Sequence, residues 1–260
     1  MMDILHLSHA IATDISDGND FKVYPFDGTK SINEYSYDIQ DAVAIQLIDT
    51  HGRGNICGYK IAFNRPSSMH YYGLTEPCFA PVFADQIYES GAKIDRELYH
   101  SLIVESEVCI RIGDDFPLDR IERAAAMARI DSVCSAFELL DHRGAFTLDP
   151  SAAQATAQGI YNVGVVLGPQ SRDLSPLEIA EPVAQLFVDG TSETVATNAA
   201  PQEPIEAVVW LASALARRGK RLRTGMIVMC GAHLPLRALD APCSLHLEMT
   251  GFDPVRLDII

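Results

Sequence analysis

The chain has 260 residues, of which 48% are hydrophobic and 21% are charged, a balance typical of an ordinary globular protein. Its formal net charge of −15 argues against a nucleic-acid or anionic-membrane partner, because either requires a basic surface. The sequence contains no run of about 18 apolar residues that would span a membrane, and its first twelve residues lack the basic start and long apolar stretch of a signal peptide.

The six cysteines contain no Cys-x-x-Cys pair and no zinc-like spacing with histidine. The simplest interpretation is that the cysteines are free, mostly buried thiols and that the protein resides in a reducing compartment. We therefore expect a cytoplasmic protein that binds neither nucleic acid nor a membrane.

The N-terminal part is expected to be a mixed segment, ending in a turn at 26–29, followed by a helix over about 31–49. The helix is indicated by apolar residues at a four-residue spacing, namely Ile39, Val43 and Leu47. A loop at 51–55 follows, and its Gly-x-Gly lacks the third glycine and the following helix of a dinucleotide site.

The segment 56–63 is typical of a strand, and it places Lys60 among apolar neighbours. Such a lysine either extends its amine to water or is held near carboxylates in a pocket. We expect a loop over 66–72 and a short strand with a turn over 79–88.

The alternation of residues 102–112 predicts a strand with one face in a core, because successive side chains point to opposite faces. Glu105 and Glu107 then share a face, roughly 6.5–7 Å apart along the strand. Two like charges held so close repel each other unless a cation lies between them, and a hard divalent cation is one solution. A solvated strand face with two surface acids is the other interpretation.

A helix is expected to open at Asp114 or Asp115, with Pro117 in its first turn. The apolar segment 133–140 after it is typical of a strand with a single acid, Glu138, in its interior. That acid either has a partner or lies on the solvent face, because a bare buried charge is too costly.

The remaining sequence predicts further strands and one strong helix. The strands are 161–169, the hairpin 186–188 and 193–196 around Asp189-Gly190, 226–229, and a closing pair at 245–249 and 255–259, and the helix opens at Pro204 and ends by Gly219. Many strands with a few helices favour a β-rich α+β fold.

With these segments in order, the chain resembles the 2-oxopent-4-enoate hydratase / 4-oxalocrotonate decarboxylase family of the fumarylacetoacetate hydrolase superfamily. The resemblance covers roughly 37–259, and its collinear order makes it specific. It rests on Tyr37-Asp38-Ile39-Gln40, Gly58-Tyr59-Lys60-Ile61, Glu105-Ser106-Glu107, Phe137-Glu138-Leu139-Leu140-Asp141, Val166-Leu167-Gly168, 204–212 and 222–228.

The resemblance implies a mixed β-sandwich or roll, with an N-terminal helical or mixed cap at 1–55 and a catalytic domain at 56–260. It implies that Glu105, Glu107 and Glu138 bind Mg²⁺ or Mn²⁺ and that Lys60 lies in the substrate pocket. It also implies a homo-oligomer and a small 2-oxo acid substrate. Three carboxylates with open positions suit an octahedral ion that prefers oxygen ligands.

Four positions depart from the family pattern and are candidate substrate-binding residues. Cys78 stands where the family usually has an aspartate, and a thiol with a pKa of about 8.5 is no simple replacement. Tyr161 and Asn162 align with the family's serines, which would bind a substrate carboxylate. Asn64 aligns with a threonine of the pocket. The metal-binding residues are thus kept while the residues around the substrate are altered.

We therefore expect a divalent-metal-dependent lyase, hydratase-like or decarboxylase-like, that acts on a small 2-oxo or 2-hydroxydienoic acid through an enolate. The alternatives are a tautomerase or C–C hydrolase of a 1,3-dicarbonyl acid, or a non-catalytic partner subunit of the family. His142 and His233 are interpreted as structural histidines, and the sequence has no Gly-x-Ser-x-Gly elbow of a serine hydrolase.

Overall fold

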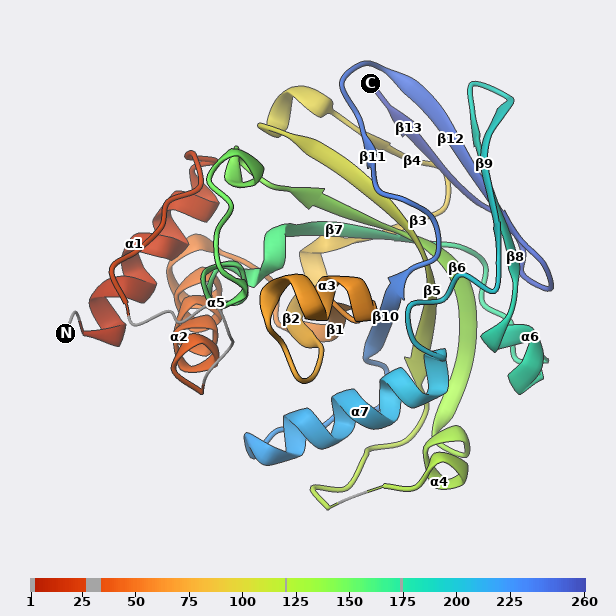
Figure 1. Cartoon of the computed structure of the whole chain (residues 1–260), viewed down its shortest axis with the longest axis horizontal. Coiled ribbons are helices and arrows are strands. Elements are labelled where there is room, and N and C mark those ends of the chain that lie inside the picture. The colour runs from red at the N-terminus through yellow and green to blue at the C-terminus, as the bar shows by residue number, and fades with distance from the viewer. Residues whose placement is uncertain (1–2, 27–33, 120, 174) are drawn as a thin grey trace.

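A computed structural model describes residues 3–26, 34–119, 121–173 and 175–260 (Figure 1). Its larger sheet has eight strands, seven of them in the order β2 (Cys78–Phe83), β1 (Ile56–Ala62), β10 (Ile227–Ala232), β5 (Leu102–Ile112), β6 (Ile130–Asp141), β7 (Asn162–Leu167), β3 (Ile87–Glu89), with β11 (Arg237–Ala238) paired to β5. The long antiparallel pair β5 and β6 forms the centre of this sheet.

The smaller sheet has five strands, in the order β4 (Ala92–Ile94), β13 (Val255–Ile259), β12 (Cys243–Met249), β8 (Val183–Val188), β9 (Thr191–Thr197). Its strands β12 and β13 contact β6 of the larger sheet, so the two sheets pack on one another. Leu245 and Leu257 from one sheet and Phe137 and Val166 from the other belong to the same buried apolar cluster. The predicted β-rich α+β fold is confirmed.

Helices cover the edges and one face of the larger sheet (Figure 1). They are α1 (Ile4–Ser16), α2 (Glu34–His51), α3 (Pro66–Tyr72), α4 (Arg123–Met127), α5 (Ala152–Ala157), α6 (Pro176–Ala180) and α7 (Pro204–Arg217). Within the described ranges, none of these helices has both the length and the apolar character that crossing a bilayer requires.

The N-terminal helices α1 and α2 pack on each other through Leu7, Ile11, Ile39 and Val43. Phe83, at the end of β2, belongs to the same apolar cluster, so the predicted cap shares a core with the strands. The division of the chain at residue 55 stays a prediction. The predicted turn at 27–29 and the predicted helix start at 31–33 lie outside the described residues.

Patterns with local signals gave the correct elements. The strand predicted over 102–112 is β5, with the same two ends. The hairpin β8–β9 turns at Asp189 and Gly190, both with positive φ. Helix α7 begins at the predicted Pro204, where the Glu203 carboxylate accepts a hydrogen bond from the Glu206 amide.

The loop predicted over 66–72 is wrong, because these residues form α3. Pro66 occupies the first turn, and Gly73 ends the helix in the left-handed conformation (φ 66°). None of the residues in this short helix is buried, so no apolar periodicity marked it in the sequence.

The helix predicted to open at Asp114 or Asp115 is also wrong, since α4 begins only at Arg123. The Asp115 carboxylate instead accepts hydrogen bonds from the amide and hydroxyl of Thr224, at 2.9 and 3.1 Å. The Phe116 amide donates to the Leu222 carbonyl. These contacts with a segment about a hundred residues away hold the capping sequence in an irregular conformation.

The alternative interpretation of a solvated strand face with two surface acids is wrong. Residues of both alternating sets are buried along β5, so both faces of the strand are covered, and its edges pair with β10 and β6. Glu107 and Glu138 are fully buried, and Glu105 is partly buried. The acids of β5 and β6 therefore require partners.

Candidate active site

Three glutamates meet at the centre of the larger sheet. Glu105 and Glu138 are directly opposite each other in the antiparallel β5–β6 pair. Glu107 lies two residues along β5 on the same face, as the alternation predicted. One carboxylate oxygen from each of the three lies within 4.8 Å of the others. The structure thus brings together the three predicted ligands.

Each buried carboxylate has one oxygen held by the protein and one without a partner. Glu107 Oε2 accepts a 2.8 Å hydrogen bond from the Gly231 amide. Glu138 Oε1 accepts a 2.8 Å bond from Asn162 Nδ2 and lies 3.1 Å from Lys60 Nζ. Glu107 Oε1 and Glu138 Oε2 are buried and have no hydrogen-bond partner among the described residues.

Because these acids are close together, the ionised forms of their carboxyl groups are costly in free energy. Burial and the charge of Glu138 raise the pKa of Glu105 to about 7. Burial, followed by the charges of Glu138 and Glu105, raises the pKa of Glu107 well above its ordinary range. Lys60, itself fully buried, offsets part of this repulsion through its contact with Glu138.

These pKa shifts predict a pH-dependent stabilisation by Mg²⁺. A carboxylate whose pKa is higher in the folded state than in the unfolded state destabilises the folded protein as the pH rises from the unfolded-state pKa through the folded-state pKa. For Glu105 this range runs from about 4.5 to about 7. Bound Mg²⁺ favours the charged forms. The Mg²⁺-induced rise in melting temperature should be larger at pH 8 than at pH 5.5, by roughly 3–6 °C.

Thermal denaturation at the two pH values, with and without Mg²⁺, measures this difference. In Glu105→Gln the metal-free protein should lose less stability between the two pH values, because one titrating carboxyl is gone. An equal Mg²⁺ effect at both pH values would contradict the assignment.

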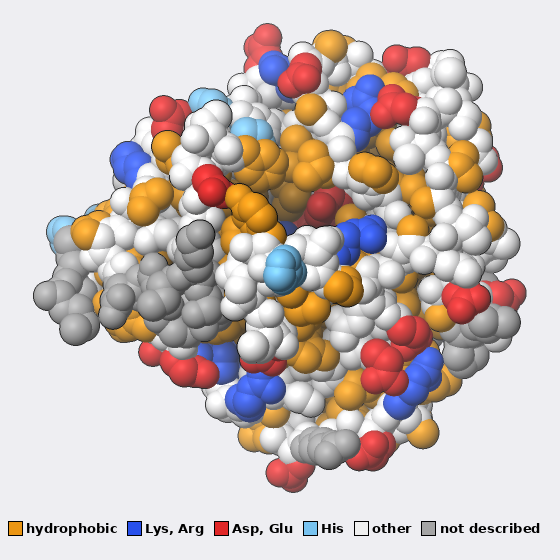
Figure 2. Space-filling view, viewed as in Figure 1, with side chains coloured by type: hydrophobic (Ala, Val, Ile, Leu, Met, Phe, Trp, Pro, Cys, Tyr) orange, Lys and Arg blue, Asp and Glu red, His pale blue; other side chains and the backbone are white. Residues whose placement is uncertain are grey.

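A cavity of about 250 Å³ opens beside the three carboxylates and is lined by Lys60, Glu105, Glu107, Asn64 and Tyr161 among others. Figure 2 shows a hollow near the middle of the face, with acidic side chains inside it and basic ones close by. Glu105, Glu107 and Lys60 therefore share a space large enough for a small organic acid.

Three non-glycine residues with left-handed backbone angles form part of the cavity wall. They are Phe63 (φ 54°), Ile160 (φ 47°) and Tyr161 (φ 63°). This conformation is costly for a β-branched residue such as Ile160, and strain of this kind is concentrated at functional sites. The wall is thus held by its surroundings in a shape that the local sequence disfavours.

Of the other predicted substrate-binding residues, one lines the cavity and two do not. Asn64 lines the cavity, and its Nδ2 donates to the Cys230 carbonyl at 3.0 Å. Asn162 donates to Glu138 and is not among the residues that line the cavity. Cys78 is fully buried in β2 and does not line the described cavity either, and burial raises the pKa of its thiol. Substrate contacts of Asn162 and Cys78 stay predictions.

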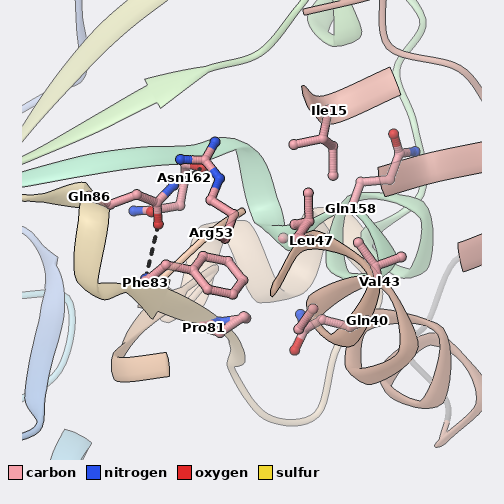
Figure 3. A pocket seen from close by; sticks show the side chains of 12 residues that line it. Ile15, Gln40, Val43, Leu47, Arg53, Pro81, Phe83, Gln86, Gln158 and Asn162 are labelled. Carbon is pink, nitrogen blue, oxygen red and sulfur yellow. Dashed lines mark hydrogen bonds between the residues drawn. The ribbon is translucent and has the colours of Figure 1, made fainter. Parts of the chain in front are cut away.

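A second hollow lies between α2 and the larger sheet (Figure 3). Asn162, Gln86 and Arg53 lie on one side of it, and Val43 and Leu47 lie on the other. Its volume of about 30 Å³ suits one or two waters and no substrate. The larger cavity beside the glutamates is therefore the candidate site.

Sequence reasoning missed Gly231, which orients Glu107. Its φ of +104° is open to glycine alone, and an added Cβ would lie 2.6 Å from Pro201 and 2.7 Å from Asn64. The glycine also brings its amide to Glu107 Oε2. The sequence offers no signal for this role, since the contact joins strands β5 and β10, more than a hundred residues apart.

Gly231→Ala should destabilise the protein by about 2–4 kcal/mol and weaken Mg²⁺ binding at least tenfold, because the clash displaces the amide that holds Glu107. Chemical denaturation and calorimetric titration with Mg²⁺ measure the two effects. Gly219→Ala is the matched control: its φ is +68° but an added Cβ meets nothing within 4 Å. Gly219→Ala should lower the free energy of unfolding by about 1 kcal/mol and leave the Mg²⁺ affinity unchanged.

The donor set fits a hard divalent cation. Three carboxylates converge, and the two partnerless buried oxygens are satisfied if they bind an ion. The positions on the cavity side remain for water and for a chelating ligand. Within the described residues this is the one group of three or more His, Cys, Asp or Glu side chains close enough to hold a metal.

No profile of a known protein family matches the chain. It is 27% identical over 231 residues to a 2-keto-4-pentenoate hydratase of Paraburkholderia xenovorans, a match that covers 85% of this chain and 83% of the relative. It is equally similar to 2-keto-4-pentenoate hydratase 3 of Pseudomonas putida. The family resemblance expected from the motifs is confirmed by these relatives.

Among solved structures, the chain is similar to 4-oxalocrotonate decarboxylase from Pseudomonas putida G7, complexed with magnesium and adipate. The TM-score is 0.87 at 17% identity, over 99% of this chain and 97% of the other. It is also similar to fumarylpyruvate hydrolase from Pseudomonas aeruginosa in complex with Mn²⁺ and pyruvate, with a TM-score of 0.56 at 15% identity, over 78% and 88% of the two chains. These likenesses show that the fold is shared.

Proposed function

We propose that this relative of the 2-keto-4-pentenoate hydratases is a divalent-metal-dependent lyase that acts on a small 2-oxo or 2-hydroxydienoic acid. The observation that carries the proposal is the convergence of Glu105, Glu107 and Glu138, with partnerless oxygens, beside a cavity that also contains Lys60. The hydratase relatives and the magnesium- and manganese-bound neighbours in structure support both the reaction class and the metal.

Glu105, Glu107 and Glu138 would hold Mg²⁺ or Mn²⁺ in this site. Such an ion supplies Lewis-acid stabilisation of the negative charge that develops on the substrate's 2-oxygen. The Gly231 amide, Asn162 and Lys60 fix the carboxylates, so little reorganisation is needed when the substrate arrives.

Lys60 is the residue of this chain best placed to act on the substrate. Its ammonium lines the cavity and is anchored on Glu138 Oε1, which orients its remaining protons. From there it would donate a hydrogen bond to a substrate oxygen or pass a proton to the carbon skeleton. Burial raises the pKa of Tyr161, so its phenol stays protonated and acts as a hydrogen-bond donor at the wall.

A C–C hydrolase reaction is the less favoured alternative, because it requires a base beside the substrate. His142 stacks on Phe146 at 4.2 Å, and neither His142 nor the buried His233 is among the residues that line the described cavity. Burial lowers the pKa of His233 to about 4, which keeps it neutral. The structure thus favours chemistry that depends on the metal and Lys60.

The test is an assay of the purified protein with Mg²⁺ and 2-hydroxypenta-2,4-dienoate or 4-oxalocrotonate, followed by ultraviolet absorbance and by CO₂ release. Loss of absorbance with formation of a 4-hydroxy-2-oxo acid indicates hydration, loss of absorbance without water addition indicates tautomerisation, and CO₂ release indicates decarboxylation. Removal of the metal with EDTA should abolish either signal. If the ligands bind and neither signal changes, the chain is a non-catalytic member of the family.

We further propose that the chain is cytoplasmic and forms a homo-oligomer. All six cysteines are free, which fits a reducing compartment. The exposed apolar side chains Leu5 and Ile45 on α1 and α2 offer a surface for a second copy. Light scattering coupled to size-exclusion chromatography tests the assembly, and a monomer at micromolar concentration would contradict it.

A further inference from the structure

Arg65, which the sequence analysis did not single out, is the second cation of the cavity. It follows β1 in an extended conformation and precedes α3. Its Nη2 donates to the carbonyls of Ala199 and Ala232, at 3.0 and 2.5 Å. These two bonds fix the guanidinium at the cavity wall from one side.

The rest of this guanidinium has no partner among the described residues. There Arg65 forms no ion pair, and no hydrogen bond involves its Nε or Nη1. It lines the same cavity as Glu105 and Glu107. Lys60, the other cation that lines this cavity, is already paired with Glu138. Arg65 is therefore the lining cation without a carboxylate partner among the described residues.

The charges of the site leave room for one further anion. Three carboxylates face the two cations Lys60 and Arg65, which leaves one negative charge. A divalent ion reverses this to one positive charge. A substrate with a single carboxylate neutralises the site, whereas a dicarboxylate leaves an excess negative charge beside buried acids.

Much of the remaining cavity wall is apolar. Ile103, Leu140, Ile160, Phe146, Leu236 and the ring of Tyr72 form this part, beside the uncharged polar side chains of Ser68 and Tyr161. Ile103, Leu140 and Ile160 are at most 5% exposed, so they form a dry inner surface, and Phe146 and Leu236 are half exposed. No charged side chain interrupts this part of the described wall, so a second carboxylate would have no cationic partner there.

We propose that Arg65 binds the carboxylate of a monocarboxylic 2-oxo acid, while the apolar wall accommodates its uncharged tail. The proposal rests on the function proposed above, because the same carboxylate and the 2-oxygen would face the metal. A guanidinium suits this role, since its Nε and Nη1 donors remain available for a charge-assisted hydrogen bond to a carboxylate while Nη2 is held by the Ala199 and Ala232 carbonyls. Arg65 thereby takes the place of the serine hydroxyls that the family resemblance implied and that this chain lacks at Tyr161 and Asn162.

Calorimetric titration tests the role of Arg65 without relying on turnover. Mg²⁺ is titrated first, and pyruvate is then titrated into the Mg²⁺-saturated protein. Arg65→Gln should keep the Mg²⁺ affinity and weaken pyruvate binding roughly 10- to 100-fold, because a charge-assisted contact is lost. Arg65→Lys should show a smaller loss. Arg237→Gln, which removes an arginine paired with Glu193 on the surface, should change neither.

Each outcome of this experiment is decisive. Unchanged pyruvate affinity in Arg65→Gln, with Mg²⁺ still bound, overturns the proposal and leaves the proposed function intact. Failure of the wild-type protein to bind Mg²⁺ contradicts the proposed function itself. If Arg65→Gln weakens 2-oxoadipate but not pyruvate, Arg65 binds a distal carboxylate, and the proposal is wrong. A change in melting temperature together with weaker Mg²⁺ binding identifies a structural role for Arg65 and also overturns it.

The tail is tested with 2-oxo acids of different length and charge. 2-Oxohexanoate has three more methylenes than pyruvate, and burying them should improve affinity for the Mg²⁺-loaded protein about tenfold or more. 2-Oxoadipate, whose tail ends in a second carboxylate, should bind more weakly than 2-oxohexanoate. The reverse order would show that the site selects a dicarboxylate and would refute this part of the proposal.

Discussion

Glu107→Gln is expected to abolish Mg²⁺ binding and to lower turnover at least about 1000-fold. Glutamine has the same shape as glutamate, so the hydrogen bond from the Gly231 amide has a carbonyl oxygen to replace Glu107 Oε2. What disappears is the charge on a fully buried ligand whose second oxygen has no protein partner. The loss of one negative charge removes an anionic ligand that the cation requires.

The same substitution should stabilise the metal-free protein. Burial and the neighbouring acids raise the pKa of Glu107, so its ionisation opposes folding, and a neutral side chain removes that cost. The variant should therefore melt at or above the temperature of the metal-free wild type and show no further rise with Mg²⁺. This combination separates a ligand from a residue that merely supports the fold.

Calorimetry with Mg²⁺, thermal denaturation and the dienoate assay measure the three effects. Glu193→Gln is the matched control, because Glu193 is an acid on the exposed strand β9, paired with Arg237. It should leave all three measurements unchanged. Mg²⁺ binding by Glu107→Gln at wild-type affinity would exclude Glu107 as a ligand.

Lys60→Met is expected to produce the second large effect, with a different signature. Lys60 and Glu138 form a buried ion pair at 3.1 Å, with 1% and 0% of their side chains exposed. Removing one partner of such a pair costs about 3–5 kcal/mol, because the other charge remains buried without compensation. The metal-free variant should be destabilised by about this amount.

Mg²⁺ should restore much of the lost stability of Lys60→Met, because the ion then supplies the missing positive charge beside Glu138. Its Mg²⁺ affinity should stay near or above that of the wild type. Turnover should nevertheless fall roughly 100-fold or more, since the donor that faces the substrate is gone. Stable Mg²⁺ binding with lost turnover is thus the opposite of the result expected for Glu107→Gln.

Unfolding curves with and without Mg²⁺, together with steady-state kinetics, measure these effects. Lys93→Met, at an exposed lysine on β4, is the control and should change neither stability nor turnover. Normal turnover of Lys60→Met would remove Lys60 from the mechanism. Normal stability without Mg²⁺ would show that the ion pair with Glu138 contributes nothing.

The parts of the fold that local sequence predicted are those whose signals lie within a few residues. The alternation of 102–112 gave both ends of β5, and Pro204 with its apolar stripe gave α7. The sequence predicts a mixed N-terminal segment, although Leu7 and Ile11, which lie in α1, repeat at a four-residue spacing. Helix α3 has no such stripe, and long-range bonds to Thr224 and Leu222 decide the conformation of Asp115 and Phe116.

The sequence by itself determined that Glu105 and Glu107 share one face of a strand, because side chains alternate along any extended chain. Only the tertiary structure placed Glu138 opposite Glu105, buried all three acids at the centre of the sheet, and brought Lys60, Gly231 and Arg65 to them. The physical reason is that register between strands, burial and an electrostatic partner depend on contacts between segments far apart in the chain. No periodicity within a single segment encodes those contacts.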